Sequence, residues 1–260
     1  MSSRALKEKM IHLGNPLSSI SEYRQRVTPL FDLHSAADAP TAYYMLYHDP
    51  NRSSLFVRND ASGRAAGVVG RFQTGIDLFR PVLTLRCPTA DIAADLLGEA
   101  CSVGRPYLLF SNLNQLPLVG GSLEISNERI LSIYALDVSR FKPTINVMVM
   151  TKTSPDGTPR AEIHSGGLQA AAGVNWQSPS FAEIYVHTES EARQRGWGRS
   201  VAAAATERIL ESGRVPLYLV EPGNEASVSL AHGLGYTDTG ARQVFADAVY
   251  TGHPVRKTSG

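Results

Sequence analysis

Three side chains that can exchange protons alternate along one short stretch of this sequence. In FAEIYVHT, residues 181–188, the two-residue period of a strand places Glu183, Tyr185 and His187 on one face and apolar residues on the other. A carboxylate, a phenol and an imidazole on one face can serve a reaction as general acid or base. A face turned to solvent would also carry polar residues, so the spacing alone leaves both interpretations open.

A second group of residues predicts an anion site at the start of a helix. In RQRGWGRS, residues 193–200, two glycines lie among three arginines, directly before the alanine-rich run VAAAATERIL. The first turn of a helix has backbone N–H groups without intrahelical partners and a partial positive charge, so it attracts phosphate groups. Gly196 and Gly198 let the backbone approach phosphate oxygens closely. The side chains that can add charged hydrogen bonds are Arg193, Arg195 and Arg199.

The elements that must hold these groups follow from apolar periodicity and turn residues. Helices are expected at 91–101 and at 200–212, the second closed by Gly213, and NDASG predicts a hairpin turn at 60–63. The expected strands are at 42–47, 53–60, 65–72, 81–86, 105–110, 145–150, 160–164, 168–176, 182–187 and 216–220.

Composition and charge limit the function. The 260 residues carry a formal net charge of +1, so no broad positive field favours nucleic acid or an anionic membrane as the main partner. The only cysteines, Cys87 and Cys101, have no metal-ligand pairing around them, and no metal is expected. The first residues, MSSRALKEKM, form no secretory h-region, and no apolar run reaches the roughly 18–20 residues of a membrane span. A cytoplasmic protein is therefore expected. A homodimer remains open.

The order of elements in the last third resembles the GNAT superfamily of acyl-CoA-dependent N-acetyltransferases. The strand AEIYVH, an RxxGxG loop, a helix, the strand PLYLV and NEASVSLAHGLGY follow one another between Phe181 and Tyr236. The loop lacks the GKS or GKT of a P-loop and the GxGxxG of a dinucleotide fold. The compact C-terminal position of this unit is similar to the FR47-like subgroup, which includes glycine N-acyltransferases. The resemblance implies an α/β GNAT fold with a mixed, mostly antiparallel sheet flanked by helices.

An internal similarity suggests that this fold occurs in tandem. Residues 83–110 and 184–220 share the order strand, loop, helix, Gly-Arg and apolar strand, but the first copy lacks the glycine-rich loop. Such units also look alike by chance, because the same periodicities generate all of them. With a boundary near FKPTIN, the expected domains are a degenerate GNAT-like or accessory domain at 1–140, an acetyl-CoA-binding GNAT domain at 141–252 and a disordered tail at 253–260.

The resemblance assigns cofactor-binding roles residue by residue. Ile184 and Val186 lie where the fourth strand of the family parts from the fifth and pairs with pantetheine. Asn224 and Ser227 match positions that contact the pantetheine arm, although Asn224 also suits an ordinary helix cap. The loop that would cradle the CoA pyrophosphate, chiefly through main-chain N–H groups, comprises Arg193, Gln194, Arg195, Gly196, Trp197, Gly198, Arg199 and Ser200.

The implied function is transfer of an acetyl group from acetyl-CoA to a primary amine of a small molecule or peptide, by direct attack in a ternary complex. Glu183 falls where histone acetyltransferase members carry a general base, although the spacing to the loop is one residue shorter, and His187 is the alternative base. Many members have a thiolate-protonating tyrosine where this sequence has Ala231. Either the thiolate leaves unassisted, or another hydroxyl such as Tyr185 replaces that tyrosine, or the protein is a non-catalytic acyl-CoA-binding regulatory module.

Overall fold

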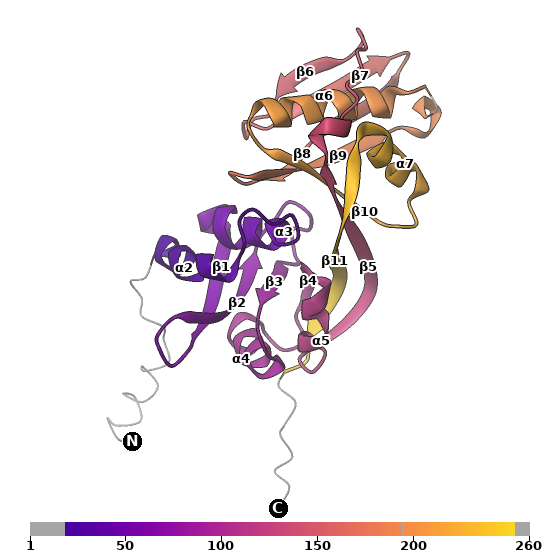
Figure 1. Ribbon diagram of the computed structural model, residues 1–260. Helices are drawn as coiled ribbons and strands as arrows, with labels where there is room; N and C mark the ends of the chain where they lie inside the picture. The colour runs from indigo at the N-terminus through magenta and orange to yellow at the C-terminus, as the bar shows by residue number, and fades with distance from the viewer. Residues whose placement is uncertain (1–18, 194, 253–260) are drawn as a thin grey trace, which may run out of the picture.

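The computed structural model of the protein describes residues 19–193 and 195–252. Within these residues one sheet runs through the whole molecule, and helices pack on it (Figure 1). No helix in this part of the chain combines the length and the apolar character that crossing a membrane requires. The tail predicted at 253–260 lies outside the described residues.

The described residues contain six α-helices and eleven strands, besides short 3-10 and π-helical turns. The α-helices are α2 (Ile20–Val27), α3 (Ala39–Ala42), α4 (Ala90–Ala100), α5 (Leu116–Val119), α6 (Trp197–Glu211) and α7 (Glu225–Leu234). The strands are β1 (Ser53–Asn59), β2 (Ala65–Phe72), β3 (Val82–Arg86), β4 (Pro106–Asn112), β5 (Leu123–Leu136), β6 (Met150–Thr153), β7 (Pro159–Ser165), β8 (Leu168–Gln177), β9 (Phe181–Thr188), β10 (Val215–Val220) and β11 (Tyr236–Tyr250).

The sheet is mixed and mostly antiparallel, as the sequence predicted. Its strand order is β1-β2-β3-β4-β11-β5-β10-β9-β8-β7-β6, and of the described pairs β3–β4 and β9–β10 are parallel. A parallel pair needs a crossover connection, which α4 supplies in the first half and α6 in the second. α4 packs on β1 and β2, and α6 packs on β7, β8 and β9. The two strand–helix–strand units therefore have the same topology.

The long strands β5 and β11 join the two halves. β11 pairs with β4 of the first half and with β5, and β5 pairs in turn with β10 of the second half. In Figure 1 both strands run from the lower half of the molecule to the upper half. The last strand of the chain thus completes the sheet of the first half, and the predicted division into domains near residue 140 stays a prediction.

Residues 42–47 are helical, so the strand predicted there is wrong. α3 carries Pro40 in its first turn, and a π-helical turn, η2 (Tyr43–Tyr47), continues it. Aromatic residues favour strands in general, but their preference yields to packing. Here the three consecutive residues 44–46 are all buried, which a helix against the core permits and an alternating strand does not.

Two further differences concern strands. The strand predicted at 145–150 differs from the observed β6, which covers only Met150–Thr153. The apolar residues Ile145 and Val147 in front of β6 are 97% and 98% exposed and pair with no strand. The longest strands, β5 and β11, were not predicted. Their pairing contains register shifts, and these interrupt the two-residue period by which a strand is detected in a sequence.

Candidate active site

β9 and β10 part after three residue pairs and open a gap in the sheet. Their parallel pairing joins residues 181–183 to residues 215–217 and ends there. Beyond this point β9 continues to pair with β8 on its other side, while its edge toward β10 has no partner strand. Such an edge is a template for an extended ligand. Ile184 and Val186, which were predicted to offer this edge, both lie in the unpaired stretch.

The loop before α6 places the start of this helix next to the gap. Gly196 is the N-cap residue of α6 and has φ = 75°, in the left-handed region that glycine adopts most easily. A Cβ on Gly198 would lie 2.8 Å from Oγ1 of Thr188 in β9, so this glycine permits close contact between helix and strand. The N–H of Ser200 bonds to the carbonyl of Gly196, and no described residue accepts a hydrogen bond from the N–H groups of residues 197–199, which can therefore serve a ligand.

The predicted basic side chains of this loop have different surroundings. Arg193 is exposed and lines the groove beside α6. The guanidinium of Arg195 lies over the ring of Trp197, 5.4 Å from its centroid, and Trp197 is buried in the core. Arg199 donates to the carbonyl oxygen of Gly233 at 2.7 Å, so its side chain joins α6 to α7. Among these arginines, Arg193 is the one best placed to meet a phosphate.

The remaining residues of the loop add main-chain groups or lie outside the described residues. The hydroxyl of Ser200 donates to the carbonyl of Gly196 and accepts from Nδ2 of Asn146, both at 3.1 Å. Ser200 is also buried, so its hydroxyl stabilises the loop. Gln194 lies outside the described residues, and its predicted role stays a prediction.

Two cavities meet at the gap between β9 and β10. The loop groove, about 690 Å³ in volume, follows the start of α6. The central cavity, about 710 Å³, opens between the two halves of the molecule. Four residues line both cavities: Val186, Tyr218, Asn224 and Ser227. A ligand in the loop groove can therefore contact a ligand in the central cavity at this point.

Asn224 and Ser227 begin α7 at this junction. Asn224 is the N-cap residue of α7, and its side-chain oxygen accepts a hydrogen bond from the N–H of Ser227 at 3.1 Å. Asn224 therefore forms the helix cap that the sequence analysis gave as its alternative role. Asn224 also lines both cavities. The predicted contact of these residues with pantetheine stays a prediction.

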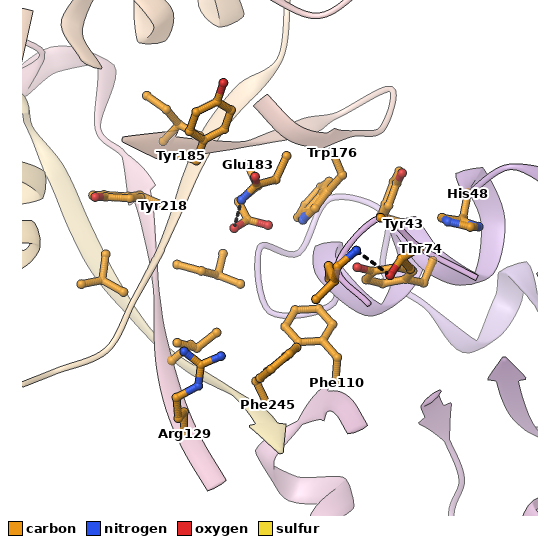
Figure 2. Close-up of a pocket in the computed structure, with 18 of the residues that line it drawn as sticks. Tyr43, His48, Thr74, Phe110, Arg129, Trp176, Glu183, Tyr185, Tyr218 and Phe245 are labelled. Carbon is orange, nitrogen blue, oxygen red and sulfur yellow. Dashed lines mark hydrogen bonds between the residues drawn. The ribbon is translucent and has the colours of Figure 1, made fainter. Parts of the chain in front are cut away.

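Glu183 lies on the wall of the central cavity with its carboxylate between Tyr218 and Trp176 (Figure 2). A β-bulge in β8 makes Asn175 the extra residue opposite this part of β9, and its Nδ2 donates to Oε1 of Glu183 at 3.0 Å. Burial raises the pKa of Glu183 to about 7, and hydrogen bonding from Asn175 and Trp176 opposes this shift in part. A carboxyl group with this pKa is suited to accept a proton at neutral pH.

Tyr185 and His187 follow Glu183 along β9 but face other surroundings. The hydroxyl of Tyr185 accepts a hydrogen bond from Nη1 of Arg160 at 3.1 Å, and in Figure 2 it points away from Glu183. His187 is exposed and lines the loop groove, not the central cavity. Tyr185 lines the central cavity as Glu183 does, and the catalytic roles predicted for Tyr185 and His187 stay predictions.

Tyr218 is a site residue that the sequence analysis missed. It is the first residue of β10 beyond the paired stretch, it is buried, and it lines both cavities. Burial raises the pKa of its phenol, the neighbouring Ser227 hydroxyl lowers it and the charge of Glu183 raises it further. Ala231, where the resemblance led us to expect a tyrosine, is fully buried in the core. The only signal in the sequence was one phenol within the otherwise apolar strand PLYLV.

The first half of the chain supplies the opposite wall of the central cavity. The residues from this half that line it include Tyr43 and Tyr44 of η2, Phe110 of β4 and Arg129 of β5. Tyr43 stacks on Trp176 of β8, with ring centroids 5.2 Å apart and planes 20° apart, which fixes the two halves against each other. No group of three His, Cys, Asp or Glu side chains that could hold a metal ion occurs among the residues that the structure describes.

The corresponding gap in the first half is filled by the protein itself. β3 and β4 pair over two residues and then part, as β9 and β10 do. Beyond this point, Oγ of Ser111 in β4 donates to the carbonyl oxygen of Leu85 in β3 at 3.4 Å, and Oε1 of Gln115 accepts from the N–H of Cys87, the residue after β3, at 2.8 Å. All four residues are buried. This gap therefore offers no free strand edge to an extended ligand.

Comparisons with known proteins agree with this architecture. Residues 163–245 match the family described as FR47-like protein. Among solved structures, a Drosophila protein is similar over 91% of this chain and 98% of its own, with a TM-score of 0.62 and 13% identity. A tandem GNAT protein from the clavulanic acid biosynthesis pathway is similar over 90% and 96%, with a TM-score of 0.58 and 14% identity.

A GCN5-related N-acetyltransferase-like protein from Streptococcus suis is similar over 87% of this chain and 99% of its own, with a TM-score of 0.54 and 17% identity. No curated protein matches the sequence. The chain thus has the GNAT fold, as predicted. Residues 163–245 form an FR47-like domain within this fold.

Proposed function

We propose that the protein transfers an acetyl group from acetyl-CoA to a primary amine. The observation that carries this proposal is the junction of two cavities at the gap between β9 and β10, with Glu183 and Tyr218 beside it. The loop groove offers free helix N–H groups and Arg193 to a pyrophosphate, and the unpaired edge of β9 offers main-chain groups to pantetheine. The central cavity then receives the amine.

The proposed reaction is a direct displacement. Acetyl-CoA supplies an activated thioester. The neutral amine nitrogen bonds to the carbonyl carbon while the carbon–sulfur bond breaks, which gives an amide and the CoA thiolate. Glu183 takes the proton that the amine loses and releases it to solvent, and Tyr218 gives its phenol proton to the thiolate and regains one from solvent. The main-chain N–H groups at the unpaired edge near Val186 stabilise the developing oxyanion.

A non-catalytic acyl-CoA-binding module is the alternative that Ala231 raised. Tyr218 favours the transferase instead. It places a hydroxyl where the two cavities meet, and an alanine at position 231 cannot supply one. The two proposals differ in one measurement, the release of free CoA thiol from acetyl-CoA in the presence of a panel of primary amines. Amine-dependent release with formation of the amide supports the transferase. Tight CoA binding without any release supports the module.

A first prediction concerns Tyr218. The change Tyr218→Phe removes the proton donor and keeps the ring, so kcat should fall about tenfold while the Kd of CoA changes little. This loss is below the roughly 10²–10⁴ of many general acids, because a thiolate leaves readily. Tyr185→Phe is the matched variant, and its kcat should stay within about twofold of wild type. A large loss from Tyr185→Phe with none from Tyr218→Phe would return the acid role to Tyr185.

A second prediction concerns stoichiometry. Because buried side chains bond to the backbone at the gap between β3 and β4, the chain should bind one CoA, and calorimetric titration should give one site per chain. The variant Gly196→Asp should weaken binding at that single site. Two sites per chain, or one that Gly196→Asp leaves intact, would place CoA elsewhere.

A further inference from the structure

The central cavity has an aromatic wall drawn from both halves of the chain. Phe110 of β4, Phe245 of β11 and Trp176 of β8 face it, and Figure 2 shows the two phenylalanine rings on the side opposite Glu183. Phe110 and Trp176 are buried, and Phe245 is half-buried. A ligand that reaches Glu183 therefore lies against rings.

These rings are held in place by one another. Tyr44 meets Phe110 edge to face, with centroids 5.6 Å apart, and Phe110 meets Phe245 at 6.3 Å. The guanidinium of Arg129 lies 4.8 Å from the centroid of Phe245 and covers it from the side of β5. Rings fixed in this way present an apolar surface that needs little ordering when a flat ligand binds.

Apart from Glu183, the charged side chains around the cavity already form ion pairs with one another. Arg129 pairs with Glu221 at 3.1 Å, and Arg52 lies 3.7 Å from the carboxylate of Asp49. His48 is buried, and burial lowers its pKa, so it is neutral at pH 7. A ligand that carries charges besides its reacting amine would have to compete with these pairs.

A buried donor next to Glu183 lacks a well-formed hydrogen bond. Nε1 of Trp176 makes no hydrogen bond of normal geometry with the other described residues, although Trp176 is only 4% exposed. This N–H lies close enough to the carboxylate of Glu183 to lower the pKa of that group, but its poor geometry leaves room for a ligand or water to complete its hydrogen bonding. The polar end of the acceptor is thus expected beside Glu183 and Trp176, and its apolar end beside Phe110 and Phe245.

We infer that the acceptor is a small arylalkylamine, a primary amine joined to an aromatic ring by a short alkyl chain. This inference rests on the proposed function. The amine nitrogen reaches Glu183, and the ring packs against Phe110 and Phe245. The product is the N-acetyl arylalkylamine, and the amine proton passes to Glu183. Polyamines, amino acids and peptides should bind less tightly, since the described residues of the cavity offer their additional charges no unpaired partner besides Glu183.

The test compares amines at saturating acetyl-CoA with the full chain, by thiol release and by detection of the amide. The amines are 2-phenylethylamine, n-hexylamine of the same charge and similar length, spermidine, glycine and a lysine-containing peptide. The kcat/KM for 2-phenylethylamine should exceed that for each other amine by about tenfold or more, as one or two ring contacts provide. If another amine equals it, the arylalkylamine inference fails and the transferase function stands.

A pair of variants tests the wall itself. Phe245→Leu keeps most of the apolar volume but removes the ring, so it should raise the KM for 2-phenylethylamine about fivefold and leave that for n-hexylamine within about twofold. Phe79→Leu is the control, because Phe79 is 84% exposed and does not line the cavity. An equal effect of Phe245→Leu on both amines would overturn the inference. If CoA binds but no amine in the panel gives thiol release, the transferase function itself fails.

Discussion

Glu183→Gln should lower kcat at pH 7 by about 10² or more while the Kd of acetyl-CoA stays near the wild-type value. Glutamine has the shape of glutamate and still accepts the hydrogen bond from Nδ2 of Asn175, but it cannot take a proton from the amine. The measurement is steady-state kinetics with an accepted amine, together with calorimetric binding of acetyl-CoA. A change in kcat without a change in binding identifies a group that acts in the chemical step.

The pH profile gives this prediction a second test. With the pKa of Glu183 raised to about 7 by burial, its carboxyl group is protonated and inactive as a base below that pH. Wild-type kcat should therefore fall on the acid side with a midpoint near 7, well above the usual 4.5 of a glutamate. In Glu183→Gln this midpoint should disappear, and higher pH should restore part of the rate because more amine arrives deprotonated.

A stability measurement confirms that the variant is folded. The raised pKa means that the protonated form of Glu183 stabilises the folded state, and this contribution is lost as the pH rises through about 7. Glu183→Gln has no such loss, so its Tm at pH 8 should equal or exceed that of the wild type. His187→Gln is the matched kinetic control, and its kcat should stay within about threefold of wild type. A large, pH-rescued loss in His187→Gln with none in Glu183→Gln would move the base to His187.

Gly196→Asp should weaken CoA binding about tenfold or more, or by about 1.4 kcal/mol or more. Gly196 lines the loop groove at the N-cap of α6, and among the described residues none but its chain neighbours comes within 4 Å of the position that a Cβ would take. An aspartate there places a negative charge where the pyrophosphate is expected. Because aspartate is a good N-cap residue and tolerates positive φ better than most, the variant should remain folded.

Gly196→Asn separates the charge from the added side chain. Asparagine has the size of aspartate and also tolerates φ = 75°, so it should weaken CoA binding by about threefold or less. The difference between the two variants should shrink as the salt concentration rises, because exposed charges are screened. If the aspartate and asparagine variants bind CoA equally well, no phosphate lies at this helix start.

Local patterns in the sequence were sufficient for the elements around the loop. The two-residue period of 181–188 predicted β9, and the apolar run with Gly213 at its end predicted α6. The paired glycines predicted a loop before a helix at 200–212, whereas α6 begins earlier, at Trp197 between the two glycines. Each of these features depends on residues close in sequence, where side-chain direction and backbone freedom act over a few positions. For the same reason, the alternation of residue types along 181–188 was enough to make Glu183 a candidate.

The site around Glu183 depended on contacts between distant parts of the chain. Tyr218 became a candidate only because β10 pairs with β9 over three residues and then parts from it. The raised pKa of Glu183 results from its burial in the folded chain, and the bulge at Asn175 depends on the pairing of β8 with β9. No local pattern encodes these pairings, since register is set by the packing of whole strands.

By itself, the sequence determined the GNAT-like order of elements, the glycine-rich loop before α6 and the polar face of β9. Only the tertiary structure decided that residues 42–47 are helical, that β5 and β11 join the halves and that the first half forms a wall of the central cavity. The physical reason is the range of the interactions. Backbone propensity and capping act within a few residues, whereas ring packing such as that of Tyr43 on Trp176 joins residues far apart in the chain and overrides local preference.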